Sequence, residues 1–406
     1  MAPTRPSHTP ATTPESPATP DRDAVLLTGV TGFVGTELLS RYVERGTRHV
    51  YALVRAGDAE AATGRLDEIL TGLYGGPDFC RGRVTAVPGD IEQAGLGLDP
   101  SRRDELTDRV AEIVHCAASV SFSLPLDQAR MINVGGTRRM LELAQDCAVA
   151  GDGLRRFSYV STAYVAGDHG GAFYEDDLEV GQGFRNSYER SKFEAERLVH
   201  EHSDHLPIQV FRPSIIVGER ATGWTSSFNV LYPPLRALAN GAIPAIPGSA
   251  STPVDVVPVD YVADGVFELS QQPLDGNETH HLVAGREATS AGRIAAMAGR
   301  YFGRRPPTML PPRLYRWTVH PVVKRLSAGR RRRALERTEM LFPYFSMRVR
   351  FDASRARSRL QPAGVRFSPL ESYFERLLDF AVGARWGRRA VGRARAGEVA
   401  SAAGAS

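Results

Sequence analysis

The chain has 406 residues, of which 42% are hydrophobic and 24% charged, with 39 Gly and 27 Pro. This composition is typical of a soluble globular protein and excludes a collagen-like, wholly disordered or disulfide-stapled chain. The three cysteines, Cys80, Cys116 and Cys147, form no CxxC pair and no even-numbered framework. We therefore expect a reducing compartment, the cytoplasm, and no metal site.

The net charge of +4 is divided unevenly along the chain. Residues 301–406 hold 23 Lys+Arg against 7 Asp+Glu, so the C-terminal quarter is basic and the remainder is acidic. Lysine is also rare, because Lys192 and Lys324 are the only two and the other basic residues are arginine. In a chain biased so strongly toward arginine, each lysine needs a reason.

The two ends of the chain have the composition of disordered segments. Residues 1–22 hold six prolines among Thr, Ser and Ala and predict a disordered tail. Residues 383–406 are rich in Arg, Ala and Gly, show no apolar period and predict a second disordered tail. The sequence contains neither the apolar core of a secretory signal nor a membrane-spanning run of about 20 apolar residues.

Between these ends, short β-branched runs alternate with helix-period segments, as in successive βαβ units. We expect six buried strands, at residues 24–29, 49–55, 84–90, 111–118, 156–162 and 208–213. The helices expected between them include residues 36–45, 135–150 and 187–202. The predicted fold is α/β, a Rossmann-type doubly wound parallel sheet with a smaller, mostly helical C-terminal lobe. We place the sheet domain at 23–285, with insertions after residue 213, and the basic lobe at 286–382.

A glycine-rich turn follows the first strand and leads into a helix-period run. Its residues are Thr28, Gly29, Val30, Thr31, Gly32, Phe33, Val34 and Gly35. Glycines at this spacing let the backbone approach a pyrophosphate, which the N-terminus of the helix can then bind. A glycine triplet alone is a weak signal, but the strand before it and the helix after it favour a dinucleotide site.

The end of the second strand indicates which dinucleotide binds. An NAD site usually has Asp or Glu there for the ribose 2′-hydroxyl, whereas an Arg receives a 2′-phosphate. The residue here is Arg55 and the strand contains no acid, so we expect NADPH. Arg55 alone also fits a solvated strand end in this arginine-rich chain, so the missing acid is the stronger argument.

Residues at the ends of the third and fourth strands complete the expected cofactor site. Asp90 and Ile91 end the third strand, where they can meet the adenine ring, although Gly-Asp is also common turn chemistry. Cys116, Ala117 and Ala118 end the fourth strand, where small side chains would let the cofactor lie close over the sheet. We expect Cys116 to be a buried structural thiol rather than a reactive one.

Tyr188 and Lys192 lie four residues apart, on one face of an expected helix. A tyrosine with a pKa of about 10 is a poor acid or base at neutral pH, and an adjacent ammonium would favour its phenolate. YxxxK also arises by chance on surface helices, but this lysine is one of two, and arginine has a different geometry. We expect Thr162, at the end of the fifth strand, to supply a third catalytic hydroxyl, with Ser161 as the alternative.

Taken together, these segments resemble an extended short-chain dehydrogenase/reductase. The resemblance runs from Ala24 to Phe267 and is carried by TGVTGFVG, ALVR, GDI, VHCAA, NVGGT, YVSTAYVAG, YERSK and RPSIIVGE. More narrowly, the chain is similar to the male-sterility-type, thioester-reductase branch. That branch includes fatty acyl-CoA reductases and the terminal reductase domains of carboxylic acid reductases and nonribosomal peptide synthetases. Little beyond residue 300 resembles it.

The resemblance implies a catalytic triad of Thr162, Tyr188 and Lys192. It also implies that the glycine-rich turn, Arg55 and Asp90 bind NADPH. The other residues that it places around the cofactor are Ile91, Cys116, Ala117, Ala118, Asn133, Ser161, Tyr188, Lys192, Pro213, Ser214 and Ile215. Within this set, Asn133 would support the active-site helix, and Pro213 and Ser214 would border the nicotinamide.

The implied reaction is reduction of an acyl thioester to an aldehyde, with further reduction to the alcohol left open. Thr162 and Tyr188 would stabilise the oxyanion, and protonation by Tyr188 would give a hemithioacetal that expels the thiol. Three alternatives remain open: a reductase of free ketones, aldehydes or hydroxysteroids, a nucleotide-sugar epimerase, and a non-catalytic NADPH-binding scaffold. Arg55 counts against the epimerase, and the intact Tyr188 and Lys192 pair counts against the scaffold.

The C-terminal lobe interleaves basic residues with Trp and apolar positions at 311–317, 320–326 and 330–333. Such a surface suits a partner that is both anionic and apolar. The candidates are CoA, an acidic acyl carrier protein or peripheral contact with an anionic membrane surface. A solvated helix face explains the pattern equally well, and no nucleic-acid-binding motif accompanies it. Lys324 lies within this basic region and needs no special role.

Overall fold

The computed structural model describes residues 22–80, 82–151, 153–241, 245–311, 313–315, 317–318, 321, 344 and 347–404. The predicted N-terminal tail lies outside the described residues except for Arg22, whose Nε donates to the Val110 carbonyl at 3.1 Å. The basic runs at 320–326 and 330–333, with Lys324, also lie outside them apart from residue 321.

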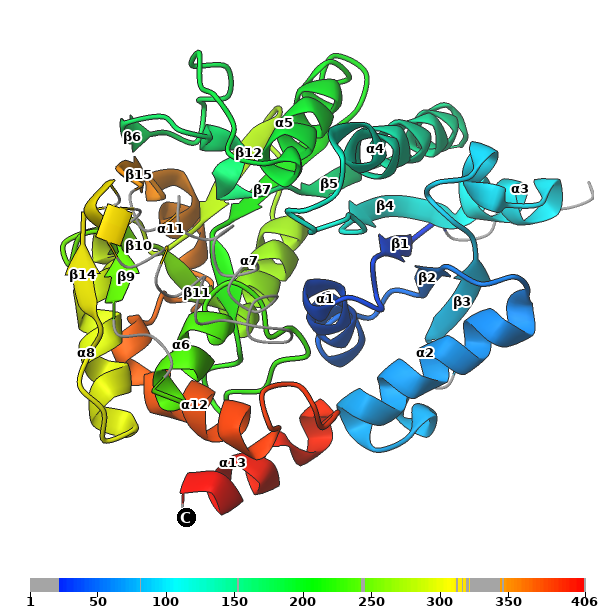
Figure 1. Cartoon of the computed structure of the whole chain (residues 1–406). Coiled ribbons are helices and arrows are strands. Elements are labelled where there is room, and N and C mark those ends of the chain that lie inside the picture. The colour runs from blue at the N-terminus through cyan, green and yellow to red at the C-terminus, as the bar shows by residue number, and fades with distance from the viewer. Residues whose placement is uncertain are drawn as a thin grey trace, which may run out of the picture.

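The centre of the molecule is a parallel sheet of seven strands in the order β12-β7-β5-β4-β1-β2-β3 (Figure 1). The strands are β1 (Ala24–Thr28), β2 (Val50–Val54), β3 (Val84–Pro88), β4 (Val110–His115), β5 (Arg156–Val160), β7 (Ile208–Pro213) and β12 (Glu278–Leu282). The first six confirm the six predicted strands. The strand order reverses between β1 and β4, and ligands bind such sheets in the crevice at this switch point.

Helices cover both faces of the sheet (Figure 1). One face carries α1 (Phe33–Glu44), α2 (Ala59–Tyr74) and α7 (Val259–Gln271), and the other carries α3 (Pro100–Arg109), α4 (Leu126–Val149) and α5 (Ser187–His200). Successive strand side chains point to opposite faces. Val25 and Leu27 of β1 therefore pack in the first core, whereas Leu26 packs in the second. The expected doubly wound α/β fold is confirmed.

The seventh strand, β12, has no counterpart in the sequence prediction because four of its five residues are polar. Glu278, His280 and His281 are nevertheless buried. His280 Nε2 lies 3.1 Å from a Glu278 carboxylate oxygen, Arg359 pairs with the other Glu278 oxygen, and His281 Nε2 lies 3.1 Å from Arg212. This pairing offsets the cost of burying polar groups, so an apolar pattern is not required.

The lobe lies beside the β12 side of the sheet (Figure 1). Its two-stranded sheets pair β6 (Gly171–Phe173) with β15 (Val349–Phe351), β8 (Ile215–Val217) with β11 (Val256–Pro258), β9 (Ala245–Pro247) with β14 (Thr308–Leu310), and β10 (Pro253–Val254) with β13 (Thr289–Ser290). Its helices include α6 (Tyr232–Ala239), α8 (Ala291–Tyr301) and α12 (Phe374–Gly383). They share an apolar core that contains Leu235, Ile294 and Phe374.

One helix departs from the predicted domain limits. Helix α11 (Ser354–Leu360), assigned by sequence to the lobe, packs Ala356 and Leu360 in the sheet core beside α7. Short 3₁₀ turns lie at η1 (Pro77–Cys80), η2 (Ala94–Gly97), η3 (Ala163–Ala166), η4 (Gly285–Glu287), η6 (Leu370–Ser372) and η7 (Arg393–Arg395).

The prediction of a disordered tail over 383–406 is wrong for the residues through Gly404. Helix α13 (Ala396–Gly404) packs against α12, and Ala396 is buried in a small cluster with Trp224 and Phe380. The two helices approach closely, since a Cβ on Gly383 would lie 2.7 Å from the Val399 carbonyl oxygen. Small residues make this contact, so no apolar period marks the helix in the sequence. None of the described helices has both the length and the apolarity to cross a bilayer.

Candidate active site

The glycine-rich turn lies at the switch point of the sheet. Gly29 has φ +79°, a left-handed conformation that favours glycine, and a Cβ there would lie 2.8 Å from the Ala117 backbone nitrogen. A Cβ on Gly35 would lie 2.0 Å from the Gly29 carbonyl oxygen. Side chains are therefore excluded where the turn meets β4 and where it meets α1.

The turn offers backbone donors to an anion. Gly32 is the N-cap of α1, and in the described part of the chain no side chain caps this helix end. The first N–H groups of a helix have no intrahelical partner, and the helix dipole adds positive partial charge. The sterically cleared turn and the uncapped helix end together fit a dinucleotide pyrophosphate.

The Thr28 side chain connects the end of β1 to the end of β4. Its Oγ1 accepts hydrogen bonds from the backbone N–H groups of Cys116 at 3.1 Å and Ala117 at 3.0 Å, and lies 2.9 Å from His115 Nδ1. Burial, with the nearby Lys192 charge, lowers the pKa of His115 to about 3, so the ring is neutral. The carboxyl ends of β1 and β4 are thereby joined through one hydroxyl.

The residues predicted to select the cofactor lie around the same crevice. Arg55 follows β2 and is 70% exposed, with its guanidinium 3.5 Å from Glu92, so it can turn toward a ligand. Asp90 accepts from the Glu92 backbone N–H at 2.9 Å and forms the turn after β3. Ile91 packs on α4, where a Cβ on Gly136 would lie 2.8 Å from its Cδ1.

The remaining turn and strand-end residues differ in exposure. Thr31 is exposed, Val34 packs on the apolar core, and Ala117 and Ala118 are half-buried at the end of β4. Burial raises the pKa of Cys116 to about 12, so this thiol stays protonated at neutral pH, as expected of a structural cysteine.

Helix α5 brings Tyr188 beside the end of β5. The helix begins at Asn186, whose side chain accepts from the Glu189 backbone N–H at 2.9 Å. Tyr188 lies within hydrogen-bonding reach of Thr162. The Thr162 hydroxyl also donates to the Pro213 carbonyl oxygen at 3.5 Å. The structure thus brings together the two hydroxyls predicted to bind the substrate oxygen.

The protonation state of Tyr188 corrects the sequence prediction. Burial raises its pKa to about 12, and the hydrogen bond with Thr162 opposes this rise only in part. The expectation that Lys192 favours the phenolate is wrong for this structure, because the ammonium group is bonded elsewhere. A neutral phenol is the form that a general acid requires.

Lys192 is bonded to the strand next to Tyr188. Its Nζ donates to Tyr159 Oη at 2.7 Å and to the Val160 carbonyl at 2.8 Å, and it lies 4.2 Å from the centre of the Tyr159 ring. Burial lowers the pKa of Lys192 to about 8. Tyr159 is a site residue that sequence reasoning missed. Tyr159 resembles the other buried residues of β5. The one sequence feature that could have identified it as a site residue is its position two residues before Ser161.

Ser161 does not offer a free hydroxyl. Its Oγ donates to Glu196, a fully buried carboxylate on α5. Arg212 on β7 donates to the same carboxylate from Nε at 2.8 Å and from Nη2 at 2.5 Å. Burial raises the pKa of Glu196, but Arg212, His200 and Ser161 outweigh it and bring the pKa to about 2. The role predicted for Ser161 as the alternative catalytic hydroxyl is therefore disfavoured.

Asn133 supports the active-site helix. Its Oδ1 accepts from the Ser119 backbone N–H at 2.7 Å, and its Nδ2 donates to the Ser119 carbonyl at 3.1 Å and to Ser191 Oγ at 2.9 Å. The amide therefore ties the loop after β4 to α5. Because both Oδ1 and Nδ2 are bonded to protein groups, Asn133 would contribute to a cofactor site only indirectly.

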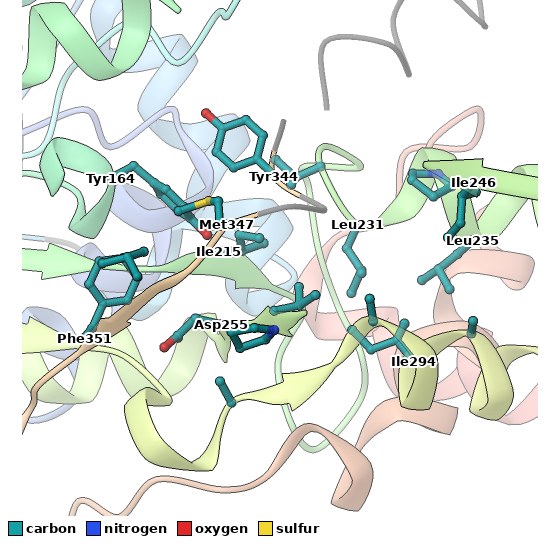
Figure 2. Close-up of a pocket in the computed structure, with 18 of the residues that line it drawn as sticks. Tyr164, Ile215, Leu231, Leu235, Ile246, Asp255, Ile294, Tyr344, Met347 and Phe351 are labelled. Atoms are coloured by element: carbon teal, nitrogen blue, oxygen red, sulfur yellow. The ribbon is translucent and has the colours of Figure 1, made fainter. Parts of the chain in front are cut away.

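A largely apolar cavity lies within the lobe. Tyr164, Tyr344 and Phe351 lie at one end, and Leu235, Ile246 and Ile294 lie at the other (Figure 2). Ile215, predicted to border the cofactor, lines its wall. Asp255 is also in the wall, but its carboxylate accepts the backbone N–H groups of Ala284 and Gly285 at 2.8 and 2.7 Å. Ser214, next to Ile215, is buried.

Aromatic rings connect this cavity to Tyr188. Phe122 lies between them, with its ring centre 5.5 Å from that of Tyr188 and 5.6 Å from that of Tyr344. Tyr344 donates from Oη to Glu189 at 2.6 Å and accepts from Asn186 at 2.8 Å. The cavity wall is therefore bonded to the first turn of the catalytic helix. Tyr344 is distant in sequence from every motif, and Phe122, four residues after Ala118, belongs to none of them, so no local pattern predicts either residue.

The family described as "Male sterility protein" matches residues 27–266. The chain belongs to this family. Isonitrile lipopeptide synthase of Streptomyces coeruleorubidus is 36% identical over 275 residues, covering 66% of this chain and 18% of that protein. Carboxylic acid reductase of Segniliparus rugosus is 33% identical over 283 residues, covering 62% and 23%. Fatty acyl-CoA reductase wat of Drosophila melanogaster is 28% identical over 286 residues, covering 60% and 53%.

The terminal R domain of the myxalamid pathway has a TM-score of 0.78 and 26% identity, covering 92% of this chain and 94% of that structure. The reductase domain of a Mycobacterium tuberculosis nonribosomal peptide synthetase, at TM-score 0.70 and 22% identity, shares the fold. The chain spans between 18% and 53% of the length of the three named curated relatives. The predicted extended short-chain dehydrogenase/reductase family is confirmed, and this male-sterility member belongs among nicotinamide-dependent oxidoreductases.

Proposed function

We propose that this male-sterility family member reduces an acyl thioester to an aldehyde, with NADPH as the reductant, in the cytoplasm. The single observation that carries the proposal is the placement of Tyr188. It is held protonated beside Thr162, and aromatic contacts join it to a largely apolar cavity. The three cysteines are unpaired, which agrees with a reducing compartment.

The residues at the switch point would hold the cofactor. The turn from Gly29 to Gly35 and the N-terminus of α1 would bind the pyrophosphate, and Asp90 with Ile91 would meet the adenine. Arg55 would bind the 2′-phosphate, and the strand before it contains no acid that would prefer a 2′-hydroxyl. When bound, NADPH supplies the hydride.

The chain's own groups would handle the thioester oxygen and its protons. Thr162 and Tyr188 would donate to the carbonyl oxygen, whose negative charge grows as the carbonyl carbon accepts the hydride. Tyr188 then gives its proton to this oxygen and the product is a hemithioacetal. In the second step the C–S bond breaks, the hydroxyl proton returns to Tyr188, and the thiolate leaves and takes a proton from solvent. The remaining product is the aldehyde.

The cavity favours an aliphatic acyl group. Its wall is almost entirely apolar among the described residues, and the carboxylate of Asp255 is already paired. Burial of each methylene contributes about 0.8 kcal/mol. The carrier of the thioester would be CoA or an acyl carrier protein, which the basic character of residues 301–406 supports. The same arginines would allow peripheral contact with an anionic membrane.

The test uses the full chain with NADPH and a panel of acyl-CoAs of increasing length, with acyl carrier protein thioesters in parallel. Products are trapped and identified by mass spectrometry, and NADPH consumed per thioester distinguishes aldehyde (one) from alcohol (two). Loss of the general acid should lower kcat roughly 10²–10⁴-fold in Tyr188→Phe. NADPH affinity should be unchanged, and the exposed Tyr174→Phe should behave as wild type. Wild-type rates in Tyr188→Phe, or turnover of ketones but not thioesters, would contradict the proposal.

A further inference from the structure

The C-terminal segment, defined here as residues 387–404, lies beside the nucleotide-binding half although it is distant in sequence (Figure 1). Its turn η7 packs on α2. The two backbones touch where glycine faces glycine, because a Cβ on Gly392 would lie 2.7 Å from the Gly72 carbonyl oxygen. The end of the chain is therefore fitted against the N-terminal half rather than resting loosely on it.

Trp224 links the C-terminal segment to the phosphate-binding turn. Its indole Nε1 donates to the Val391 carbonyl at 2.9 Å, and only 4% of the residue is exposed. The centre of its ring system lies 5.7 Å from that of Phe33. Phe33 is the first residue of α1, directly after Gly32, so its backbone N–H is one of the unpaired donors that face a pyrophosphate. Movement of Trp224 would shift this donor.

Arg393 forms a second link, to the body of α1. Its Nη1 lies 3.5 Å from Glu37 Oε1 and 3.4 Å from Glu44 Oε1. Glu37 is fully buried one turn inside the helix, and Arg41 binds its other oxygen at 2.7 Å. Burial raises the pKa of Glu37, and Arg393 is the largest of the charges that oppose this rise. Without Arg393, Arg41 alone would offset the charge of Glu37, and more of that negative charge would act on a helix end that must bind an anion.

We propose that the C-terminal segment is a positioning element of the cofactor site. It fixes Phe33 and the start of α1 through Trp224, and Arg393 offsets the charge of Glu37 so that the helix end keeps its affinity for phosphate. Neither residue needs to touch the cofactor. This inference goes beyond the proposed reaction, because it concerns dinucleotide binding whatever substrate is reduced.

The experiment measures equilibrium binding of NADPH to the full chain by fluorescence titration, without turnover. Arg393→Ala should raise the Kd for NADPH about 10-fold. Arg395→Ala is the matched control, because Arg395 lies two residues away, is 70% exposed and pairs at 3.5 Å with the exposed Glu398. Its Kd should remain within about 2-fold of wild type. Equal affinities of wild type and Arg393→Ala, or an equal loss in both variants, would overturn the proposal.

Two further variants separate positioning from general destabilisation. If the charge of Glu37 weakens binding, adding Glu37→Gln to Arg393→Ala should return the Kd for NADPH to within about 3-fold of wild type. The double variant also tests the charge argument if Arg393→Ala alone folds poorly. A double variant as weak as Arg393→Ala would contradict the charge argument. Arg393→Lys, which keeps the charge, should retain most of the affinity. These NADPH dissociation constants are measured without turnover, so they would stand even if the protein did not reduce thioesters.

Discussion

Replacing Tyr159 with phenylalanine removes one of the two oxygen acceptors of the Lys192 ammonium. The hydroxyl accepts from Nζ at 2.7 Å, while the Val160 carbonyl, at 2.8 Å, and the aromatic ring both remain. A hydrogen bond to a charged group contributes about 1.5–3 kcal/mol, and one pKa unit corresponds to about 1.4 kcal/mol. Because two favourable contacts survive, the lower figure applies. The pKa of Lys192 should fall by about one unit.

The direction of the pH effect follows from which form is stabilised. Tyr159 accepts a hydrogen bond from the charged lysine, so its loss favours the neutral amine and lowers the pKa. In the wild type, burial already places the pKa of Lys192 at about 8, whereas that of Tyr188 is about 12. Tyr188 therefore stays protonated across the assay range. The loss of activity at alkaline pH should instead follow deprotonation of Lys192, because its ammonium holds Tyr159 and Val160 of β5, directly before Thr162.

The assay is the pH dependence of kcat/KM for thioester reduction between about pH 6 and pH 10. The alkaline limb of the wild type should have its midpoint near pH 8, and that of Tyr159→Phe near pH 7. Tyr51→Phe is the control, because Tyr51 is similarly buried in the same sheet but donates to Glu105 away from the site. An unmoved limb in Tyr159→Phe, or a limb displaced to higher pH, would refute the reasoning.

Two more substitutions test the ends of the site. Arg55→Ala should raise the Kd for NADPH roughly 10–100-fold, because a charge-assisted contact contributes about 1.5–3 kcal/mol, and should leave NADH binding unchanged. Equal losses for the two cofactors in a titration would contradict the assignment of Arg55. Ile294→Phe fills the cavity end remote from Tyr344, so kcat/KM for long acyl-CoAs should fall about 200-fold, the effect of excluding about four methylenes, while short ones are unaffected. A uniform loss at every chain length would show that the acyl group lies elsewhere.

The sequence predicts the features that local spacing determines. The glycine-rich turn and the six strands depend on residues within a few positions of one another, and the structure places both as expected. The scarcity of lysine indicates a special role for Lys192, but it does not predict which group the ammonium contacts. Spacing puts Lys192 on the face of Tyr188, but it does not show that Tyr159 on the neighbouring strand is the nearer acceptor.

The features that the sequence does not predict depend on tertiary packing. Strand β12 buries polar residues because Arg212 and Arg359, from other elements, pair with them. The C-terminal helix α13 is stabilised by contact with Trp224 and by small residues that show no period. Tyr344 joins the catalytic helix from a segment that resembles no motif. Each contact brings together residues far apart in the chain, so no sequence window contains both partners.

The central claim, that a thioester carbonyl accepts the hydride, is tested most directly by isotope transfer. The full chain is supplied with a long-chain acyl-CoA and NADPH deuterated at C4 of the nicotinamide, and the trapped aldehyde is analysed by mass spectrometry. We expect one deuterium at C1 of the aldehyde and a 10²–10⁴-fold slower appearance of that product with Tyr188→Phe. An aldehyde without deuterium at C1, or labelling of a ketone while the thioester stays intact, would contradict it.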